Sequence, residues 1–210
     1  MTRDILAIID YGMGNLHSAS KAIAKLNEKA GSKYEVVVTS APEVIGRAAK
    51  VVLPGVGAFG DCMHNLEQYG LVAVIKDVAG RGTPLLGICL GLQLLFDGSE
   101  EDPGVPGLGI LPGMVRKITA PGLKIPHMGW NSLELRIPSG LFAGLPPAPY
   151  VYFVHSYHAV PEQPSLITAV TDYGSAVTAA VGSGNVKAVQ FHPEKSSGAG
   201  LAILANFLRS

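Results

Sequence analysis

Residues 83–96 read TPLLGICLGLQLLF, an apolar strand-like run that passes through a cysteine into a second apolar run of helical character. Cys89 has Gly87 two residues before it and Gly91 two residues after it. A buried cysteine packs as a small hydrophobic residue and needs no glycines nearby. Glycines remove the Cβ atoms that would collide in a tight turn. The stretch therefore predicts a strand–turn–helix unit that exposes the Cys89 sulfur, in the form of a nucleophile elbow.

The first half of the chain repeats this alternation of strand-like and helical segments. ILAIID at 5–10 precedes the helical NLHSASKAIAKLNEKA at 15–30, and the segment 61–79 has helical character throughout. Such alternation is typical of βαβ units and a parallel sheet. Apolar strands without polar alternation, such as KVVLP at 50–54, indicate a sheet covered on both faces. We expect an α/β fold with a single open, mostly parallel sheet flanked by helices.

The second half is expected to add antiparallel strands and hairpins. Strand-like pieces occur at 108–118, 130–135, 150–160, 166–171 and 175–191, separated by prolines and glycines. Residues 198–210 read as a closing amphipathic helix. Because no repeat, low-complexity segment or linker divides the chain, we expect one domain over residues 1–210.

The composition favours a globular protein with small-molecule or protein partners. The chain has 210 residues, of which 48% are hydrophobic and 15% charged. Lys plus Arg and Asp plus Glu are equal at 16 each, so no net field attracts nucleic acid or an acidic membrane. No apolar run is long enough to span a bilayer, and the start MTRDILAIID lacks the layout of a signal peptide. We expect a soluble cytoplasmic protein whose two cysteines, Cys62 and Cys89, are free thiols.

A candidate base for the cysteine lies in QFHPE at 190–194, at the end of an apolar strand. Proline holds the residue before it in extended geometry, which places the side chains of His192 and Glu194 toward one side. In this arrangement His192 takes the Cys89 proton, and Glu194 fixes its tautomer and stabilises the imidazolium. HPE by itself is more typical of a surface turn. Its combination with the elbow favours a catalytic triad.

Acyl transfer also needs donors for the developing oxyanion. The backbone N–H of Leu90, which follows the nucleophile, is one donor by analogy with other elbows. A second donor could come from PGVGA at 54–58, since its glycines allow peptide orientations that other residues resist. The simpler interpretation of that loop is a turn that ends a strand.

No metal or cofactor is predicted. The six histidines form no HExxH motif, and neither CxxC nor a short ligand cluster is present. DYGMGNL at 10–16 contains GxG but lacks the third glycine of a dinucleotide fingerprint. The histidines are His17, His64, His127, His155, His158 and His192.

Taken together, the motifs carry a family resemblance. GICLGLQLLF with the downstream QFHPEKS resembles the class I (triad) glutamine amidotransferases. DYGMGNL, PHMGWN at 126–131 and YFVHSYH at 152–158 are similar to the glutaminase subunits of imidazole glycerol phosphate synthase. The resemblance covers essentially the whole chain.

The resemblance implies hydrolysis of glutamine to glutamate and ammonia without a cofactor. It makes Cys89 the nucleophile that forms a thioester, His192 the base and then the acid, and Glu194 its orienting group. Carried over position by position, it also assigns binding roles. It implies an oxyanion donor at Val56, which is mobile, and substrate contacts at Gly57, Gln93 and the Ser156 and Tyr157 backbone.

It further implies a partner and an interface. In the family, ammonia passes to a cyclase subunit with a (β/α)8 barrel, which forms a heterodimer with the glutaminase and makes imidazole glycerol phosphate for histidine biosynthesis. The resemblance places Asn15, His127, Trp130 and Tyr152 near that partner. An exposed tryptophan or tyrosine is a typical interface anchor, although the lone Trp130 could also be a core residue.

Three alternatives stay open at the level of sequence. The chain could serve another ammonia-using synthase, such as that of pyridoxal phosphate or guanylate, although PHMGWN and YFVHSY argue against this. It could be a binding subunit that keeps the fold without turnover, which the intact triad makes less favourable. It could also be a cysteine peptidase on a similar fold, which Gln93 argues against.

Overall fold

An eight-stranded mixed sheet forms the centre of the molecule. In the computed structural model, residues 3–14, 16–137 and 140–210 are described. The strands are, in their order across the sheet, β2 (Tyr34–Thr39), β1 (Asp4–Ile9), β3 (Lys50–Gly55), β4 (Leu85–Cys89), β13 (Val186–Val189), β12 (Ala176–Ser183), β11 (Ile167–Asp172) and β8 (Glu134–Leu135). The first five are parallel and the last three join antiparallel. The expected parallel core with antiparallel strands in the second half is confirmed.

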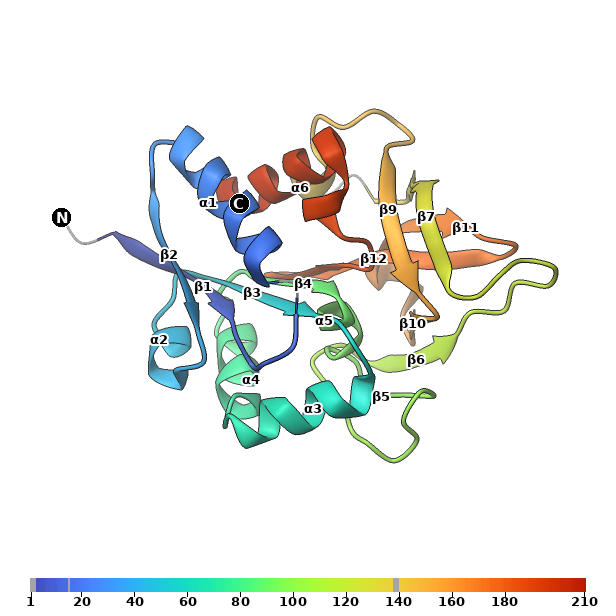
Figure 1. Ribbon diagram of the computed structural model, residues 1–210, viewed down its shortest axis with the longest axis horizontal. Helices are drawn as coiled ribbons and strands as arrows, with labels where there is room; N and C mark the ends of the chain where they lie inside the picture. The colour runs from blue at the N-terminus through green and yellow to red at the C-terminus, as the bar shows by residue number, and fades with distance from the viewer. Residues whose placement is uncertain (1–2, 15, 138–139) are drawn as a thin grey trace.

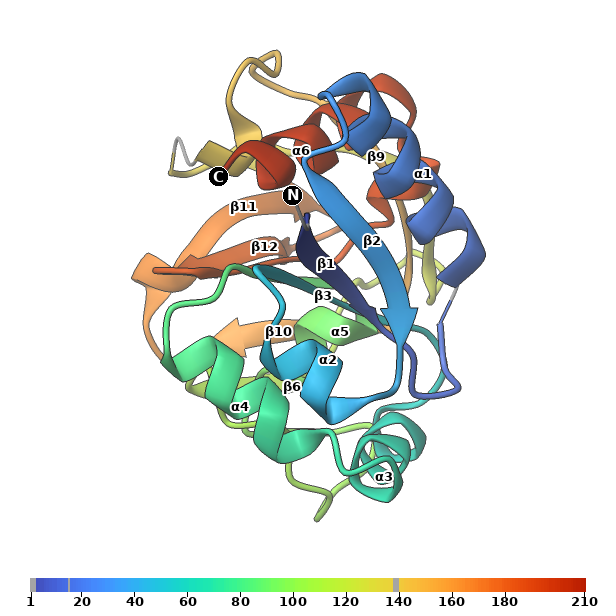
Figure 2. The same ribbon diagram turned by 90° about the vertical axis from the view of Figure 1, so that its left-hand side faces the viewer.

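Helices cover both faces of this sheet (Figure 1). On one face lie α1 (Leu16–Lys29) and α6 (Ser197–Arg209), which pack on each other. On the other face lie α2 (Pro42–Gly46), α3 (Phe59–Gln68) and α4 (Val72–Gly80), as the side view also shows (Figure 2). None of the helices in the described ranges combines the length and the apolar character needed to cross a bilayer.

The sequence of strand β1 lacks polar alternation because both faces of the strand are buried. Leu6 and Ile8 point into the core beneath α1 and α6, where they join Phe207. Ala7 and Ile9 point into the opposite core, beneath α2, α3 and α4. Successive side chains of a strand point to opposite faces, so a strand buried on both faces is apolar at every position.

Two small sheets lie beside the large one. The sequence predicted a single sheet and did not predict these two. β10 (Tyr157–Pro161), β6 (Gly113–Lys117) and β5 (Gly98–Ser99) form one of them. β7 (His127–Ser132) and β9 (Tyr150–His155) form an antiparallel pair. Three short 3-10 helices complete the described elements: η1 (Gly140–Phe142), η2 (Pro164–Leu166) and η3 (Pro193–Lys195).

Two expected helices are shorter in the structure. The helical segment 61–79 is broken at Gly70, whose φ of 66° ends α3 before α4 begins. The apolar run after Cys89 is helical only over α5 (Leu90–Gln93). Its later carbonyls accept hydrogen bonds from the loop 108–111 in place of a continuing helix, for example Leu94 from the Leu108 N–H. Tertiary hydrogen bonds therefore outweigh the helical pattern here.

Candidate active site

Cys89 occupies a strained turn between β4 and α5. Its φ of 56° and ψ of −113° lie in a region that residues with a side chain rarely adopt. A Cβ on Gly91 would overlap the Leu53 carbonyl oxygen, and one on Gly87 would lie 2.8 Å from the Gly91 oxygen. The two glycines are therefore needed for the close approach of backbones, as the sequence predicted.

Parallel pairing brings the other glycine-rich loops to the same edge of the sheet. β3 pairs with β4 so that Gly55 lies opposite Cys89, and β1 lies on the other side of β3. The carboxyl ends of parallel strands form the ligand-binding edge of such sheets. The loop PGVGA thus lies next to the cysteine, and the loop that follows β1 lies beyond it at the same edge.

His192 reaches the cysteine from the neighbouring strand. β13 pairs with β4, with Val189 opposite Ile88, and the chain then places His192 over the pocket. Its Nδ1 lies 2.9 Å from Glu194 Oε1. A carboxylate can only accept, so Nδ1 carries the proton and Nε2 is left for the thiol.

The charge state of His192 follows from these contacts. Burial acts to lower its pKa, but hydrogen bonds to Cys89 and Glu194 and the charges of both groups outweigh burial and raise the pKa to about 9. The imidazole is therefore protonated at neutral pH and can pair with a thiolate. The structure brings the three predicted triad residues together.

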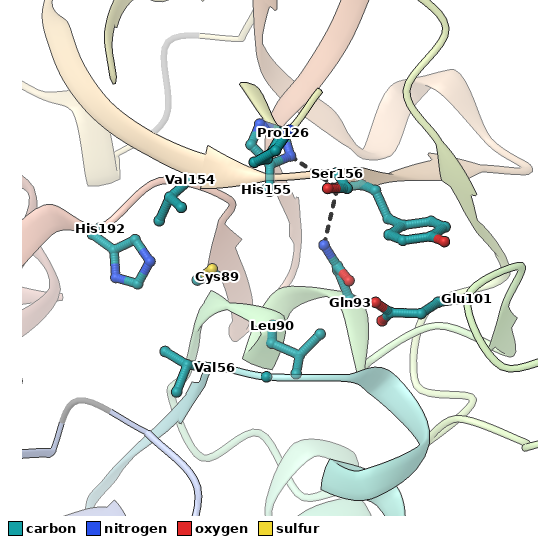
Figure 3. A pocket seen from close by; sticks show the side chains of 12 residues that line it. Val56, Cys89, Leu90, Gln93, Glu101, Pro126, Val154, His155, Ser156 and His192 are labelled. Carbon is teal, nitrogen blue, oxygen red and sulfur yellow. Dashed lines mark hydrogen bonds between the residues drawn. The ribbon is translucent and has the colours of Figure 1, made fainter. Parts of the chain in front are cut away.

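A cavity of about 290 Å³ opens beside the sulfur. Figure 3 shows His192 on one side of Cys89, Gln93 on the other, and Val56 and Leu90 next to them. All residues predicted for the oxyanion hole and for substrate binding line this cavity. The lining residues are Val56, Gly57, Cys89, Leu90, Gln93, Glu101, Pro126, Val154, His155, Ser156, Tyr157 and His192.

The Gln93 side chain has a fixed orientation. Its Nε2 donates to the Tyr157 carbonyl oxygen and to Gln190 Oε1, both at 3.0 Å. Both amide protons are thereby used. No hydrogen bond to its Oε1 is found among the described residues, so this oxygen can accept one from a ligand in the cavity.

Glu101 is a cavity residue that the sequence did not reveal, because it stands in an acidic run that is typical of a solvated loop. Its Oε2 accepts the Phe59 N–H at 2.9 Å, which fixes the carboxylate at the start of α3. Burial raises its pKa, and the hydrogen bond from Phe59 opposes that shift. Glu101 adds an anionic acceptor to the cavity.

Two buried side chains hold the PGVGA loop from below. The Tyr11 hydroxyl donates to the Pro54 carbonyl at 2.7 Å, and the Cys62 thiol lies 3.5 Å from the Val56 carbonyl oxygen. Burial raises the pKa of Tyr11 well above its usual value and that of Cys62 to about 11, so both stay protonated donors. Both cysteines are free thiols, as expected.

The residues expected at a partner interface fall into three groups. Trp130 is 52% exposed and lies edge-on to Tyr152, with ring centroids 6.1 Å apart, on the paired strands β7 and β9. His127 is only 2% exposed and stacks on Phe153 and Tyr173, so it lies beneath this surface. Asn15 lies outside the described residues.

His127 belongs to a buried hydrogen-bonded chain. His155 Nδ1 donates to the Tyr157 carbonyl at 2.8 Å, which leaves its Nε2 to accept from His127 Nδ1 at 3.0 Å. Burial lowers the pKa of His127 to about 4 and that of His155 to about 3. Both rings are therefore neutral at physiological pH. Within the described ranges, no three His, Cys, Asp or Glu side chains gather as a metal-ligand set.

A family model described as Glutamine amidotransferase class-I matches residues 7–210. A protein of Moorella thermoacetica, named "Imidazole glycerol phosphate synthase subunit HisH", is 54% identical over 202 residues, which are 96% of this chain and 93% of that protein. A protein of Acaryochloris marina with the same name is 50% identical over 97% of this chain and 94% of its own length.

Solved structures agree on the fold. A structure described as "Crystal structure of glutamine amidotransferase" has a TM-score of 0.70 and 19% identity and covers 96% of this chain and 98% of its own. The glutaminase domain of Trypanosoma brucei CTPS with bound acivicin has a TM-score of 0.66 and 17% identity, with 100% of this chain and 95% of that chain covered. At such identities the likeness concerns the fold alone.

Proposed function

Because the chain belongs to the class I glutamine amidotransferases, among the HisH subunits of imidazole glycerol phosphate synthase, we propose that its cavity hydrolyses glutamine to glutamate and ammonia for histidine biosynthesis. The observation that carries the proposal is the strained Cys89 in one small cavity with His192, whose ring is paired with Glu194. A glutaminase of another synthase, a non-catalytic binding subunit and a cysteine peptidase are less well supported, since the named relatives match over nearly the full chain.

The reaction starts with protonated His192 beside the Cys89 sulfur, since the pKa of His192 is about 9. The sulfur attacks the side-chain amide carbon of glutamine as the thiolate. The S–C bond forms, and the His192 Nε2 proton passes to the amide nitrogen as the C–N bond breaks and ammonia leaves. Water then attacks the thioester, His192 takes its proton, and glutamate leaves as the sulfur regains its charge. Glu194 keeps the ring in one tautomer throughout.

The oxyanion of each tetrahedral intermediate needs two backbone donors. Leu90 follows the nucleophile at the start of α5, and Val56 lies across the cavity in the glycine-bounded loop. Gly57 adopts a φ of 101°, a backbone conformation that glycine adopts more easily than other residues. It therefore allows the adjoining Val56 peptide to change its orientation. Loss of one oxyanion donor typically slows an enzyme about 100- to 1000-fold. The orientation of the Val56 peptide is thus a proposed control point.

Substrate orientation follows from the acceptors that remain free. Gln93 Oε1 and the Glu101 carboxylate can accept from the α-ammonium group of glutamine. Gly57 and the backbone of Ser156 and Tyr157 complete the proposed contacts. A cavity of about 290 Å³ lies at the lower end of the range of about 300 to 1,000 Å³ that is typical of small-molecule sites, which is compatible with a free amino acid.

The relatives are named as subunits of a synthase, which implies a partner subunit. We assign the partner as a cyclase with a (β/α)8 barrel that forms a heterodimer with this chain in the cytoplasm and receives the ammonia. The exposed Trp130 and the adjoining Tyr152 support an interface on β7 and β9. The single-domain assignment for residues 1–210 is part of the same proposal.

Glutamate formation by the purified chain, with and without a cyclase and its nucleotide ligand, tests the function. We expect weak turnover by the chain alone, a strong increase in the liganded complex, and none with Cys89→Ala. Retained turnover in Cys89→Ala would remove the cysteine from the mechanism. Covalent labelling of Cys89 by a glutamine-mimicking electrophile separates a catalytic subunit from one that only binds, because the label needs a reactive thiolate.

A further inference from the structure

A side chain outside the triad contacts the candidate nucleophile. Gln190 stands between β13 and His192, and its side chain is fully buried. Its Nε2 lies 3.8 Å from the Cys89 sulfur, and its Oε1 accepts from Gln93 at 3.0 Å. A buried amide without partners costs free energy, so each of its polar atoms is expected to be paired. Within the described residues, the sulfur is the acceptor found for this Nε2.

The direction of the Gln190 amide is fixed by its neighbours. The Tyr157 carbonyl can only accept, so Gln93 turns its Nε2 toward it and toward Gln190. Gln190 must therefore present its oxygen to Gln93 and its NH2 group to the sulfur. The opposite amide orientation would set two NH2 groups against each other.

We propose that Gln190 is a further catalytic residue, which donates its side-chain N–H to the Cys89 sulfur and stabilises the thiolate. The sulfur then has two donors, His192 and Gln190. The two differ in chemistry, because an amide cannot exchange its proton with the thiolate at physiological pH. His192 moves the proton during the reaction, whereas Gln190 remains a donor at every step.

The hydrogen bond from Gln190 to the sulfur does not depend on the proposed glutaminase function. Its effect on catalysis does rest on that function. In thioester hydrolysis the C–S bond breaks and negative charge returns to the sulfur. A donor aimed at the sulfur stabilises that developing charge, and hydrogen bonds to charged groups are stronger than neutral ones. Gln93 also links the site to substrate, since a ligand that binds its Oε1 polarises the amide chain toward Gln190 and the sulfur.

The pH dependence of Cys89 alkylation by iodoacetamide tests the proposal on the full chain, with the modified peptide quantified by mass spectrometry. Gln190→Met keeps most of the volume but removes the donor. We expect the pH of half-maximal alkylation rate to rise by about one unit, and kcat/KM of the liganded complex to fall about 10- to 100-fold. Gln190→Glu keeps the acceptor for Gln93 and replaces the donor by a carboxylate, so a larger upward shift is expected.

Asn206→Leu is the matched control, because Asn206 is a buried amide that donates to the Leu141 and Ala143 carbonyls away from the cavity. It should lower stability and leave the alkylation curve unchanged. A Gln190→Met curve that coincides with that of the unmutated chain would overturn the proposal, whether or not glutamine is hydrolysed. If Gln190→Met does not fold, Gln190→Glu is judged by the same criterion.

A second measurement uses the unmutated chain and needs no substitution in the core. The side-chain amide proton of 15N-labelled Gln190 should shift in NMR spectra when Cys89 is alkylated, because the charged acceptor is lost. An unshifted Gln190 amide resonance overturns the proposal. Since neither readout uses glutamine, failure of the proposed function and failure of the Gln190 role are distinguishable.

Discussion

The imidazole of His192 is buried between a thiol and a carboxylate, and this ties the stability of the fold to pH. Burial acts against its charge, but Cys89 and Glu194 raise its pKa to about 9, above the ordinary value of 6.5. A raised pKa means that the folded state binds the proton more tightly than the unfolded chain does. The resulting stabilisation is complete below about pH 6.5 and is lost as the pH rises through about 9.

Glu194→Gln should weaken this dependence, because it removes the carboxylate that favours the charged ring. The unmutated chain should have a higher unfolding free energy than the variant near pH 6. We expect this difference to be about 1–3 kcal/mol larger near pH 6 than near pH 9.5. Urea unfolding at both pH values measures the difference. Glu134→Gln, at an exposed carboxylate on β8, is the control and should leave the dependence unchanged. Parallel pH curves for Glu194→Gln and the unmutated chain would contradict the expectation.

At the scale of elements, helix α3 supports the loop that carries the proposed oxyanion donor. The Cys62 thiol donates to the Val56 carbonyl from below. Cys62→Ala removes this donor, so the Val56–Gly57 peptide is held less firmly and the neighbouring oxyanion donor is less well fixed. Because a thiol is a weak donor, we expect only about a threefold loss in kcat of the liganded complex, with KM for glutamine little changed.

Hydrogen exchange over residues 54–58 checks the cause of that loss. Exchange should be faster in Cys62→Ala than in the unmutated chain, whereas Cys62→Ser, which keeps a hydroxyl donor, should restore both exchange and kcat. Equal exchange in the alanine and serine variants would remove the thiol as the support of the loop.

The strand pair β7–β9 depends on the buried His127. His127→Phe keeps an aromatic ring to stack on Phe153 but leaves His155 Nε2 without its donor. An unsatisfied buried acceptor costs about 1–3 kcal/mol, so the unfolding free energy should fall by that amount. His64→Phe is the control, because His64 is exposed on α3 and, among the residues that the structure describes, pairs only with Gln68. A change within about 0.5 kcal/mol is expected. Equal effects of the two substitutions would contradict the importance of the buried chain.

At the scale of the whole molecule, the sequence predicted what repeats locally and missed what depends on distant contacts. The parallel core followed from apolar runs such as β1 and β3, since both faces of those strands are buried. The separate sheets of β5–β6–β10 and β7–β9 did not follow, because strand partners leave no local signal. The short α5 was missed because carbonyls after Gln93 bond to the loop 108–111.

The candidate site divides in the same way. Cys89, His192 and Glu194 stand in short motifs whose spacing carries their chemistry. The structure brings Cys89 and His192 to one cavity and pairs His192 with Glu194. Glu101 and Gln190 could be placed only once the fold set them against the cavity and the sulfur. Burial of His127 beneath β7 also depends on the packing of Phe153 and Tyr173, far from it in the sequence.

Assembly with the proposed cyclase should depend on the aromatic surface of β7 and β9. Trp130 is 52% exposed. An exposed indole contributes most to the binding free energy when a partner desolvates it completely. Trp130→Ala should therefore weaken the complex by about 2 kcal/mol or more, roughly 30-fold in Kd, while the free chain unfolds within about 0.5 kcal/mol of the unmutated chain. Val38→Ala, at an exposed residue of the far edge strand β2, should leave Kd unchanged. Titration calorimetry measures both affinities, and an unaltered Kd for Trp130→Ala would move the interface away from β7.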